Sequence, residues 1–182
     1  MKIGIISDTH DDVEYTNKAI DIFDRSEVTA VIHAGDIISP PIVKEFKRLT
    51  DKGIEFFGVM GNNDGEKNGL KQAFQFIGGN FFTDVGKFEL DGLRFGVYHG
   101  HVIKKSKKLM NSGKLDIYIY GHSHNKDPAN GEIRRGEKGT ILLNPGSTHR
   151  PSETFYTTPH YFRESSVLIF DTQTNECNFI NL

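Results

Sequence analysis

The stretch Lys2-Ile-Gly-Ile-Ile-Ser-Asp8-Thr-His10 joins a short apolar run to a loop that carries an acidic side chain and an imidazole. Isoleucine-rich runs of this length, bounded by polar residues, are typical of a buried strand. The next segment, 13–23, has its apolar residues at helical spacing, and Asp12 is in position to cap that helix. This opening predicts a strand, a loop and a helix, the repeating unit of a parallel sheet.

The same alternation continues through the first half of the chain. Strands are expected at 29–33 and 55–60. A helix should begin at Ser39-Pro40 and run through Leu49, because serine and proline are favoured at the cap and first turn. Another helix is expected over 70–77, where two glycines follow.

The second half of the chain is richer in strands. Segments 87–90 and 93–98 flank Asp91-Gly92, a dipeptide typical of a two-residue hairpin turn. One weak helix is expected around 104–110. Further strands are expected at 116–120, 133–135, 140–143, 167–170 and 177–180. The whole pattern predicts one α/β domain over residues 1–182, with a mixed sheet or two sheets packed face to face between helices.

Composition narrows the class of protein. The 182 residues are 36% hydrophobic and 25% charged, as in an ordinary globular protein, and the formal net charge is −2. That charge argues against a protein whose main role is to coat nucleic acid. The single cysteine, Cys177, suits a reducing compartment, and the first apolar run is too short for a signal peptide or a membrane anchor. We therefore expect a cytoplasmic protein without membrane association.

Polar side chains follow five of the expected strands, at the point where each strand ends. They are Asp8, His10, Asp36, Asn62, His99, His122 and His124. Ligands of open α/β sheets bind beyond the carboxyl ends of the strands, so these side chains should converge. Carboxylate, amide and imidazole groups without a thiolate suit Mn²⁺, Fe²⁺, Ni²⁺ or Zn²⁺. Seven ligands exceed the needs of one tetrahedral ion and suffice for two ions that share a carboxylate.

Five motifs together resemble the calcineurin-like metallophosphoesterase family. They are Asp8-x-His10, Gly35-Asp36, Gly61-Asn62-Asn63-Asp64, His99-Gly-His101 and Gly121-His122-x-His124. The match runs from residue 1 to about 150, and the likeness is strongest to small archaeal and bacterial phosphodiesterases, which share an Asn-Pro-Gly-Ser run like that at 144–147. The resemblance implies an αββα four-layer sandwich with two mixed β-sheets.

The resemblance also divides the ligands between two divalent ions. One ion would be held by Asp8, His10, Asp36 and His124. The other would be held by Asp36, Asn62, His99 and His122. Asp36 would then be the bridge, and a hydroxide shared by the two ions would attack a phosphodiester bond. Mn²⁺ is the first expectation for both positions, with Ni²⁺, Fe²⁺ and Zn²⁺ as alternatives.

One position departs from the family members that cleave monoesters well. Those members have a histidine as general acid to the leaving group where this chain has Asn63. An amide is a poor proton donor near neutral pH, so a diester substrate is favoured. His101 is expected either to help at the phosphate or to line the cleft, and Arg150 is a candidate contact for the substrate phosphate. Asp36, Asn63 and His101 are therefore the candidate catalytic residues.

The sequence leaves two interpretations for each of two segments, and it leaves two alternative functions for the protein. The aromatic segment 155–162 could stack on a nucleotide-like substrate or form the interface of a homo-oligomer. Lysines 104, 105, 107 and 108 form either a solvated face or a patch that steers an anionic substrate. A metal-binding scaffold of the same fold, as in a retromer subunit, is one rival function, and the seven retained ligand positions weigh against it. A nuclease is the other, and the negative net charge weighs against a nucleic-acid substrate.

Overall fold

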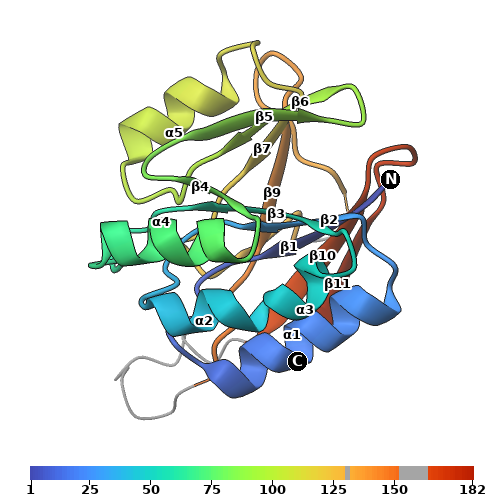
Figure 1. Ribbon diagram of the computed structural model, residues 1–182. Helices are drawn as coiled ribbons and strands as arrows, with labels where there is room; N and C mark the ends of the chain where they lie inside the picture. Colours follow the sequence, from blue (N-terminus) through green and yellow to red (C-terminus); the bar gives the residue numbers. More distant parts are fainter. Residues whose placement is uncertain (130–131, 152–163) are drawn as a thin grey trace.

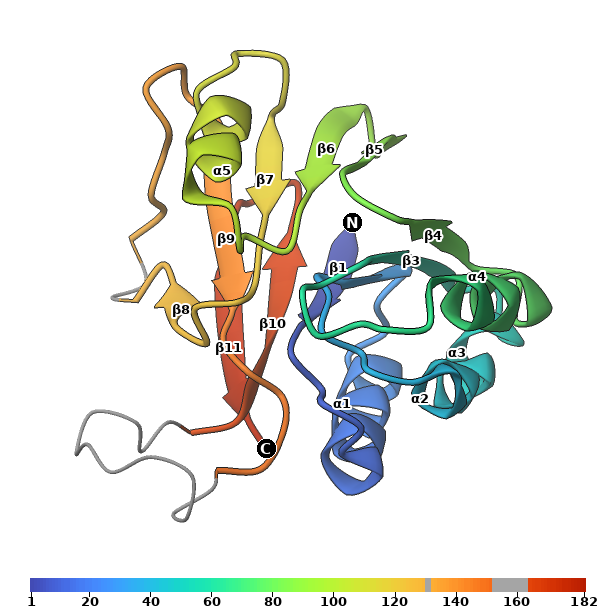
Figure 2. The ribbon, with the colours of Figure 1, turned by 90° about the vertical axis from the view of Figure 1, so that its left-hand side faces the viewer.

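A computed structural model of the chain describes residues 1–129, 132–151 and 164–182, so the aromatic segment 155–162 lies outside the described residues. Two sheets pack face to face, and helices cover their outer sides (Figure 1 and Figure 2). Within the described ranges, one sheet has six strands in the order β11-β10-β1-β2-β3-β4, and the other has five in the order β5-β6-β7-β9-β8. The expected αββα sandwich with two mixed sheets is confirmed.

The first sheet is built on a parallel core with an antiparallel edge. Its parallel strands are β1 (Lys2–Ile6), β2 (Ala30–His33), β3 (Glu55–Val59) and β4 (Asn80–Phe82). Its antiparallel strands are β10 (Ser166–Asp171) and β11 (Cys177–Asn181). β4 is three residues long, too short to leave a periodic signal in the sequence, and it was not expected.

Four helices of the described chain lie on the outer side of this sheet (Figure 1). They are α1 (Val13–Arg25), α2 (Pro40–Glu45), α3 (Lys47–Thr50) and α4 (Lys67–Phe76). The Asp12 side chain caps α1 by accepting a hydrogen bond from the Tyr15 backbone N–H. The expectation of one continuous helix from Ser39-Pro40 through Leu49 is wrong, because the chain turns at Phe46, whose buried ring stacks on that of Phe56.

The second sheet has three parallel strands between two antiparallel edges. Its strands are β5 (Gly86–Leu90), β6 (Leu93–Val97), β7 (Ile117–Ile119), β8 (Lys126–Asp127) and β9 (Ile141–Pro145). The Asp91-Gly92 hairpin forms as expected between β5 and β6, and α5 (Ile103–Met110) covers the outer face (Figure 1). No helix in the described part of the chain has the length and apolar character needed to cross a membrane.

The expected strand at 133–135 is wrong. Only an isolated bridge, between Arg135 and Ile141, forms there. The neighbouring Arg134 turns its guanidinium to the Asp127 carboxylate, with Nε 2.9 Å from Oδ2. This segment is therefore held by a side-chain ion pair beside β8, a two-residue strand that the sequence did not predict.

Among the described residues, three apolar clusters fill the spaces between the four layers. Ile3 and Ile5 of β1 point between the two sheets, whereas Ile6 points to the helices on the outer side. A third cluster, around Tyr98 and Tyr118, lies between the second sheet and α5. Strands that are buried on both faces leave no room for polar groups along their length. The chemistry-bearing side chains are therefore confined to the strand ends.

Candidate metal centre

Loops from both sheets meet at one edge of the sandwich, where β1, β2, β3, β6 and β7 end. The Asp8 N–H donates to the Gly35 carbonyl at 2.9 Å, which ties the β1 loop to the β2 loop. The Gly121 N–H donates to the His99 carbonyl at 2.9 Å, which ties the loops after β7 and β6. Backbone hydrogen bonds thus tie these loops together in pairs.

Five of the seven expected ligands come within a few ångströms of one another. Asp8 Oδ1 lies 3.1 Å from His124 Nε2 and 3.8 Å from His10 Nε2. Asp36 Oδ2 lies 3.2 Å from His99 Nε2 and 3.7 Å from His10 Nε2. Two groups of three could each hold an ion: Asp8 with His10 and His124, and Asp8 with Asp36 and His99. Their ligand atoms lie within 4.8 Å of one another in each group.

The donor atoms of this cluster fit a divalent cation. Asp8 Oδ1, His10 Nε2 and His99 Nε2 are buried, and none of them makes a hydrogen bond within the part of the chain that the structure describes. A buried polar atom without a partner costs free energy, on the order of 1–3 kcal/mol. A cation shared by these atoms removes that cost, and oxygen and imidazole nitrogen are suitable ligands for borderline divalent metals.

The electrostatics of the crevice favour positive charge. Burial by itself raises the pKa of Asp8, but the neighbouring His10 and His124 rings lower it by more, so the net pKa lies below the usual range. Burial likewise opposes ionisation of Asp36, and the contact with His99 reverses the effect and lowers its pKa. Burial disfavours the charged form of His99, yet Asp36 and Asp8 raise its pKa overall. Two ionised carboxylates therefore set a negative potential where a cation would bind.

The backbone adopts the left-handed region at most of the expected ligands. The φ angles are 54° at Asp8, 45° at His10, 54° at Asp36, 63° at His122 and 55° at His124. Positive φ is uncommon for residues other than glycine and costs of order 1 kcal/mol or more at each position. Such strain persists only where the surrounding structure enforces it, and it clusters at functional sites. The sequence motifs do not reveal this property.

Neighbouring groups orient the ligands. The Ser7 hydroxyl and the His122 N–H donate to Asp8 Oδ2 at 2.6 and 3.1 Å. His99 Nδ1 lies 2.9 Å from the Ala34 carbonyl, which can only accept a hydrogen bond. In the neutral ring Nδ1 therefore carries the proton, and the lone pair of Nε2 is then available to a metal ion. Partners of this kind fix ring orientation in metal sites.

The Gly61-Asn62-Asn63-Asp64 motif holds Asp36 from the side. The Asn63 backbone N–H donates to Asp36 Oδ1 at 2.8 Å, and its side-chain Nδ2 donates to Asp36 Oδ2 at 2.7 Å. Buried Asp64 accepts hydrogen bonds from the Gly61 and Ile38 N–H groups, which fixes the loop. Asn62 is exposed beside this contact, and its role as a metal ligand stays a prediction.

Three further histidine rings surround the cluster. His122 lies 5.2 Å from His99 between ring centroids, and His101 lies 5.8 Å from His99. The His149 ring packs against His10, with the ring centroids 5.0 Å apart, and the His149 backbone N–H donates to the Asp8 carbonyl. We did not single out His149 as a site residue from the sequence. Its position directly after the Asn-Pro-Gly-Ser run is the signal that could have found it.

The Asn-Pro-Gly-Ser run supports the centre from the second sheet. Asn144 Nδ2 donates to the Gly121 carbonyl at 3.1 Å, and Asn144 Oδ1 accepts from the Gly146 N–H at 3.0 Å. The Ser147 hydroxyl donates to the Asp8 carbonyl at 3.1 Å. This run therefore braces the loops that carry His122 and Asp8.

Arg150 lies at the rim and contacts acidic residues of α1 and its cap. Its Nε donates to Asp12 Oδ2 at 2.8 Å, and its Nη2 lies 3.0 Å from Glu14 Oε2. The side chain is 57% exposed. A phosphate group would have to draw the guanidinium away from these carboxylates, and contact between Arg150 and substrate stays a prediction.

Removing metal should lower thermal stability. Ionised Asp8 and Asp36 repel each other in the crevice when no cation separates them. A ligand that binds only the folded state adds about 2.7 kcal/mol at one hundred times its dissociation constant. For a chain of this size that corresponds to a shift in Tm of about 5–10 °C. Thermal unfolding of chelator-treated protein, before and after Mn²⁺ is restored, measures the shift. Equal Tm values in both states would contradict a metal centre at these residues.

A family model described as the calcineurin-like phosphoesterase superfamily domain matches residues 1–175. Phosphodiesterase MJ0936 of Methanocaldococcus jannaschii is 38% identical over 147 residues, covering 80% of this chain and 83% of that protein. A probable metallophosphoesterase of Methanothermobacter thermautotrophicus is 31% identical over 160 residues, covering 85% and 81%.

A solved structure shares the whole fold. It is described as a novel archaeal phosphodiesterase, is 34% identical, and superposes with a TM-score of 0.81 over 100% of both chains. The region of similarity therefore includes the loops that carry the candidate ligands.

Proposed function

The chain belongs to the calcineurin-like phosphoesterase superfamily, and from this membership we propose that it is a phosphodiesterase dependent on two divalent metal ions. The observation that carries the proposal is the cluster of buried ligand atoms from Asp8, His10 and His99 that have no hydrogen-bond partner among the described residues. We take residues 1–182 as one catalytic domain. A cytoplasmic location and a homo-oligomeric state stay predictions.

The proposed division of ligands follows the resemblance. One ion is assigned to Asp8, His10, Asp36 and His124, and the other to Asp36, Asn62, His99 and His122. The position of Asp36 Oδ2 between His99 at 3.2 Å and His10 at 3.7 Å supports a bridging role. Asp8 Oδ1 lies 3.8 Å from His10 and 4.0 Å from His99, so Asp8 is the competing candidate for the bridge.

Two divalent ions, when bound, would activate water as a nucleophile and neutralise the charge that develops on a phosphodiester. The chain supplies the fixed frame for that reaction. Asp8 and Asp36 stay ionised, the Ala34 carbonyl orients the His99 ring through Nδ1, and Asn63 holds both oxygens of Asp36. A preorganised frame of this kind needs no rearrangement during the reaction.

We propose that His101 is the side chain that faces the leaving group of the substrate. It is exposed beside His99 and His122, and its Nε2 lies 3.3 Å from the Tyr98 hydroxyl. Burial and the neighbouring His99 lower the pKa of His101, which favours the neutral ring. A neutral imidazole held by a tyrosine can orient the substrate or relay a proton at Nε2.

The proposed substrate is a small phosphodiester, with nucleotide-like diesters as one candidate class. Mn²⁺ is the first metal to test, and Ni²⁺, Fe²⁺ and Zn²⁺ follow, because the ligand set does not distinguish them. Metal analysis of the purified protein, with hydrolysis of bis(p-nitrophenyl) phosphate and p-nitrophenyl phosphate measured side by side, tests the proposal. We expect two metals per chain and faster hydrolysis of the diester. Two bound metals without hydrolysis of either ester would instead indicate a binding role.

Replacing Asn63 with histidine should add activity on alkyl phosphate monoesters. An alkoxide leaving group needs a proton in the transition state, and an imidazole with a pKa near 6.5 can supply it around neutrality. We expect a gain of about 10-fold or more on alkyl monoesters. Hydrolysis of the p-nitrophenyl diester should change much less, because p-nitrophenolate leaves without protonation. Initial rates on both substrates, at matched metal content, measure the difference.

The control for that substitution is Asn63→Ala. Both variants lose the amide contact with Asp36 Oδ2, and only the histidine variant adds a proton donor. Equal monoester rates in the two variants would show that position 63 is not the vacant acid position, and His101 would become the better candidate.

A further inference from the structure

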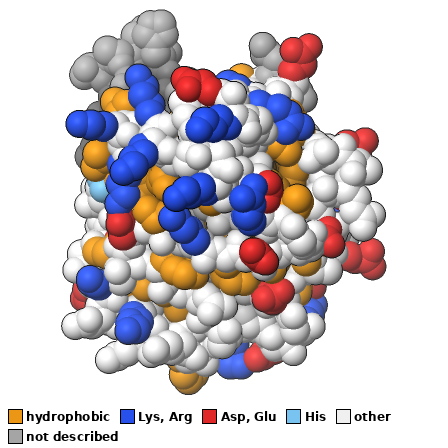
Figure 3. Space-filling model, turned by 90° about the horizontal axis from the view of Figure 1, so that it is seen from above, with side chains coloured by type: hydrophobic (Ala, Val, Ile, Leu, Met, Phe, Trp, Pro, Cys, Tyr) orange, Lys and Arg blue, Asp and Glu red, His pale blue; other side chains and the backbone are white. Residues whose placement is uncertain are grey.

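A cavity lies beside α5 on the outer face of the second sheet. It has a volume of about 720 Å³, within the range of ligand sites. It is lined by Val85, Lys87, Lys105, Lys108, Leu109, Asn111, Ser112, Lys114, Leu115 and Lys138. Figure 3 shows Lys and Arg side chains gathered around hydrophobic ones on this face. None of the lining residues is among the proposed metal ligands.

Most of the positive charge in the lining has no acidic partner. Five of its residues are lysines, and no acidic residue lines the cavity among those that the structure describes. Lys105 pairs with Asp84. The four others, Lys87, Lys108, Lys114 and Lys138, take part in no ion pair within residues 1–129, 132–151 and 164–182. Like charges held around one hollow repel one another, and an anion bound between them would relieve that repulsion.

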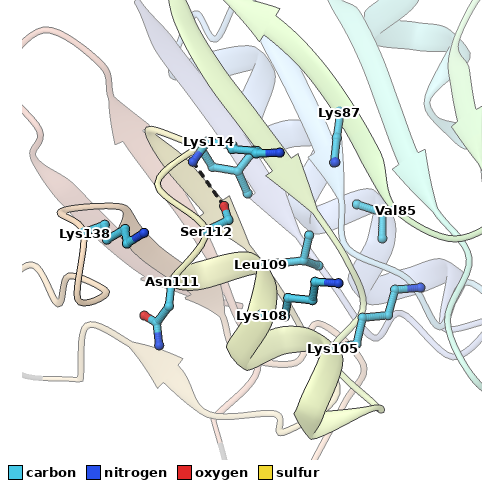
Figure 4. A pocket seen from close by; sticks show the side chains of 10 residues that line it. Val85, Lys87, Lys105, Lys108, Leu109, Asn111, Ser112, Lys114 and Lys138 are labelled. Atoms are coloured by element: carbon cyan, nitrogen blue, oxygen red, sulfur yellow. Dashed lines mark hydrogen bonds between the residues drawn. The ribbon is translucent and has the colours of Figure 1, made fainter.

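The lysines come from separate parts of the chain. Lys87 lies on β5, Lys108 on α5, Lys114 on the segment before β7, and Lys138 on the segment before β9. Figure 4 shows Lys108 and Leu109 projecting from α5 on the side where Lys87 and Val85 lie. The positive charge of this cavity is therefore not simply that of a lysine-rich helix surface. Tertiary structure has therefore gathered charges that the sequence distributes over some fifty residues.

The remaining lining is apolar or already engaged. Val85, Leu109 and Leu115 supply apolar surface. The Ser112 hydroxyl accepts from the Lys114 N–H at 3.2 Å, and Asn111 Oδ1 accepts from the Glu137 N–H at 3.0 Å. Recognition of a ligand is thus left to the lysine ammonium groups.

The character of the lining selects the ligand class. An aromatic platform for base stacking and an arginine fork for bidentate pairing are both missing from the described lining. Lysine ammonium groups act as flexible point charges with three donors each, which suits phosphate oxygens in varied orientations. We propose that this cavity is a binding site for a small anion that carries two or more phosphate groups. No residue of the lining has a role in the proposed hydrolysis.

Binding of inorganic tripolyphosphate tests the proposal. The protein with its metals bound is titrated calorimetrically, and Lys108→Gln/Lys114→Gln is compared with Lys104→Gln/Lys107→Gln. Both double variants lose the same charge, three of the four positions lie on α5, and only the first pair lines the cavity. We expect about 10-fold weaker binding in the first variant and a change within about twofold in the second. Equal weakening in both would show non-specific attraction and overturn the proposal.

A footprint on the unaltered protein locates the anion without relying on any variant. Tripolyphosphate also binds metal ions, so affinity alone does not place it. Lysine acetylation, followed by mass spectrometry, should show protection at Lys87, Lys108, Lys114 and Lys138, and none at Lys104 or Lys107. Uniform protection or no protection would contradict the site. Protection by a single-stranded oligonucleotide, and not by tripolyphosphate, would assign the surface to a polymer and would also overturn the proposal.

Discussion

Replacing Asp36 with asparagine is expected to lower phosphodiester hydrolysis by on the order of 10³-fold or more. A metal pair supplies several kcal/mol of transition-state stabilisation, and each 1.36 kcal/mol is tenfold in rate. Asp36 Oδ2 lies within 3.7 Å of both His10 and His99, so its negative charge serves both halves of the centre. Asparagine keeps the shape and loses that charge. Initial rates on bis(p-nitrophenyl) phosphate and metal content per chain measure the effect.

Two comparisons interpret the Asp36→Asn result. Asp21→Asn removes an exposed carboxylate that pairs with Arg48 far from the centre, and it should leave the rate unchanged. Asp8→Asn tests the competing bridge. If Asp36→Asn keeps two metals and near-normal turnover while Asp8→Asn loses both metals, then Asp8 is the shared ligand and our assignment is wrong.

Replacing Gly61 with alanine is expected to lower activity by about 10²-fold and to weaken metal binding. A Cβ at Gly61 would lie 2.2 Å from Asp36 Oδ1 and 2.3 Å from the Asp36 backbone nitrogen, so the loop or the carboxylate must move. A displacement of about 1 Å at a reacting centre can cost 10²-fold in rate. Overpacking also costs typically 1–3 kcal/mol of stability. Activity, metal content and Tm of the variant measure these effects.

Gly65→Ala is the matched control in the same loop. A Cβ at Gly65 has no heavy atom within 4 Å, and its φ lies outside the left-handed region. Its activity should stay within about twofold of the unaltered protein, as for other surface substitutions. Equal losses in the two variants would mean that loop flexibility, rather than the Asp36 contact, limits activity. A Gly61→Ala protein that keeps both metals and full activity would contradict the expected clash with Asp36.

The sequence was informative about elements with strong local signals. Short apolar runs predicted β1, β2 and β3, and the Asp91-Gly92 turn predicted the β5–β6 hairpin. Burial of parallel strands on both faces produces continuous apolar runs, and these are visible without any structure. Short elements left no such signal. β4 and β8 depend on neighbouring strands for their hydrogen bonds. At 133–135, where a strand was expected, the structure has an isolated bridge and the Arg134–Asp127 ion pair instead.

The candidate ligands could be predicted because strand ends and glycine-bounded loops place them in the sequence. Their distances could not. His10 and His124 are separated by more than one hundred residues, and only the packing of the two sheets brings His124 to Asp8 and His10. The role of His149 also depends on that packing, since its ring lies 5.0 Å from His10. The sequence placed Asn63 beside the ligands. Only the structure shows that its side chain contacts Asp36.

The sequence by itself determined the class of fold, the five strand-end motifs and the oxygen and nitrogen character of the ligands. These properties are local, because strand propensity, turn chemistry and donor type belong to residues and their immediate neighbours. Tertiary structure alone decided the left-handed backbone of five ligands, the side-chain support of Asp36 and the convergence of Lys87, Lys108, Lys114 and Lys138 on one cavity. Those properties depend on which distant segments share a sheet edge or a surface. Spacing along the chain does not encode that information, and only the packing of sheets and helices supplies it.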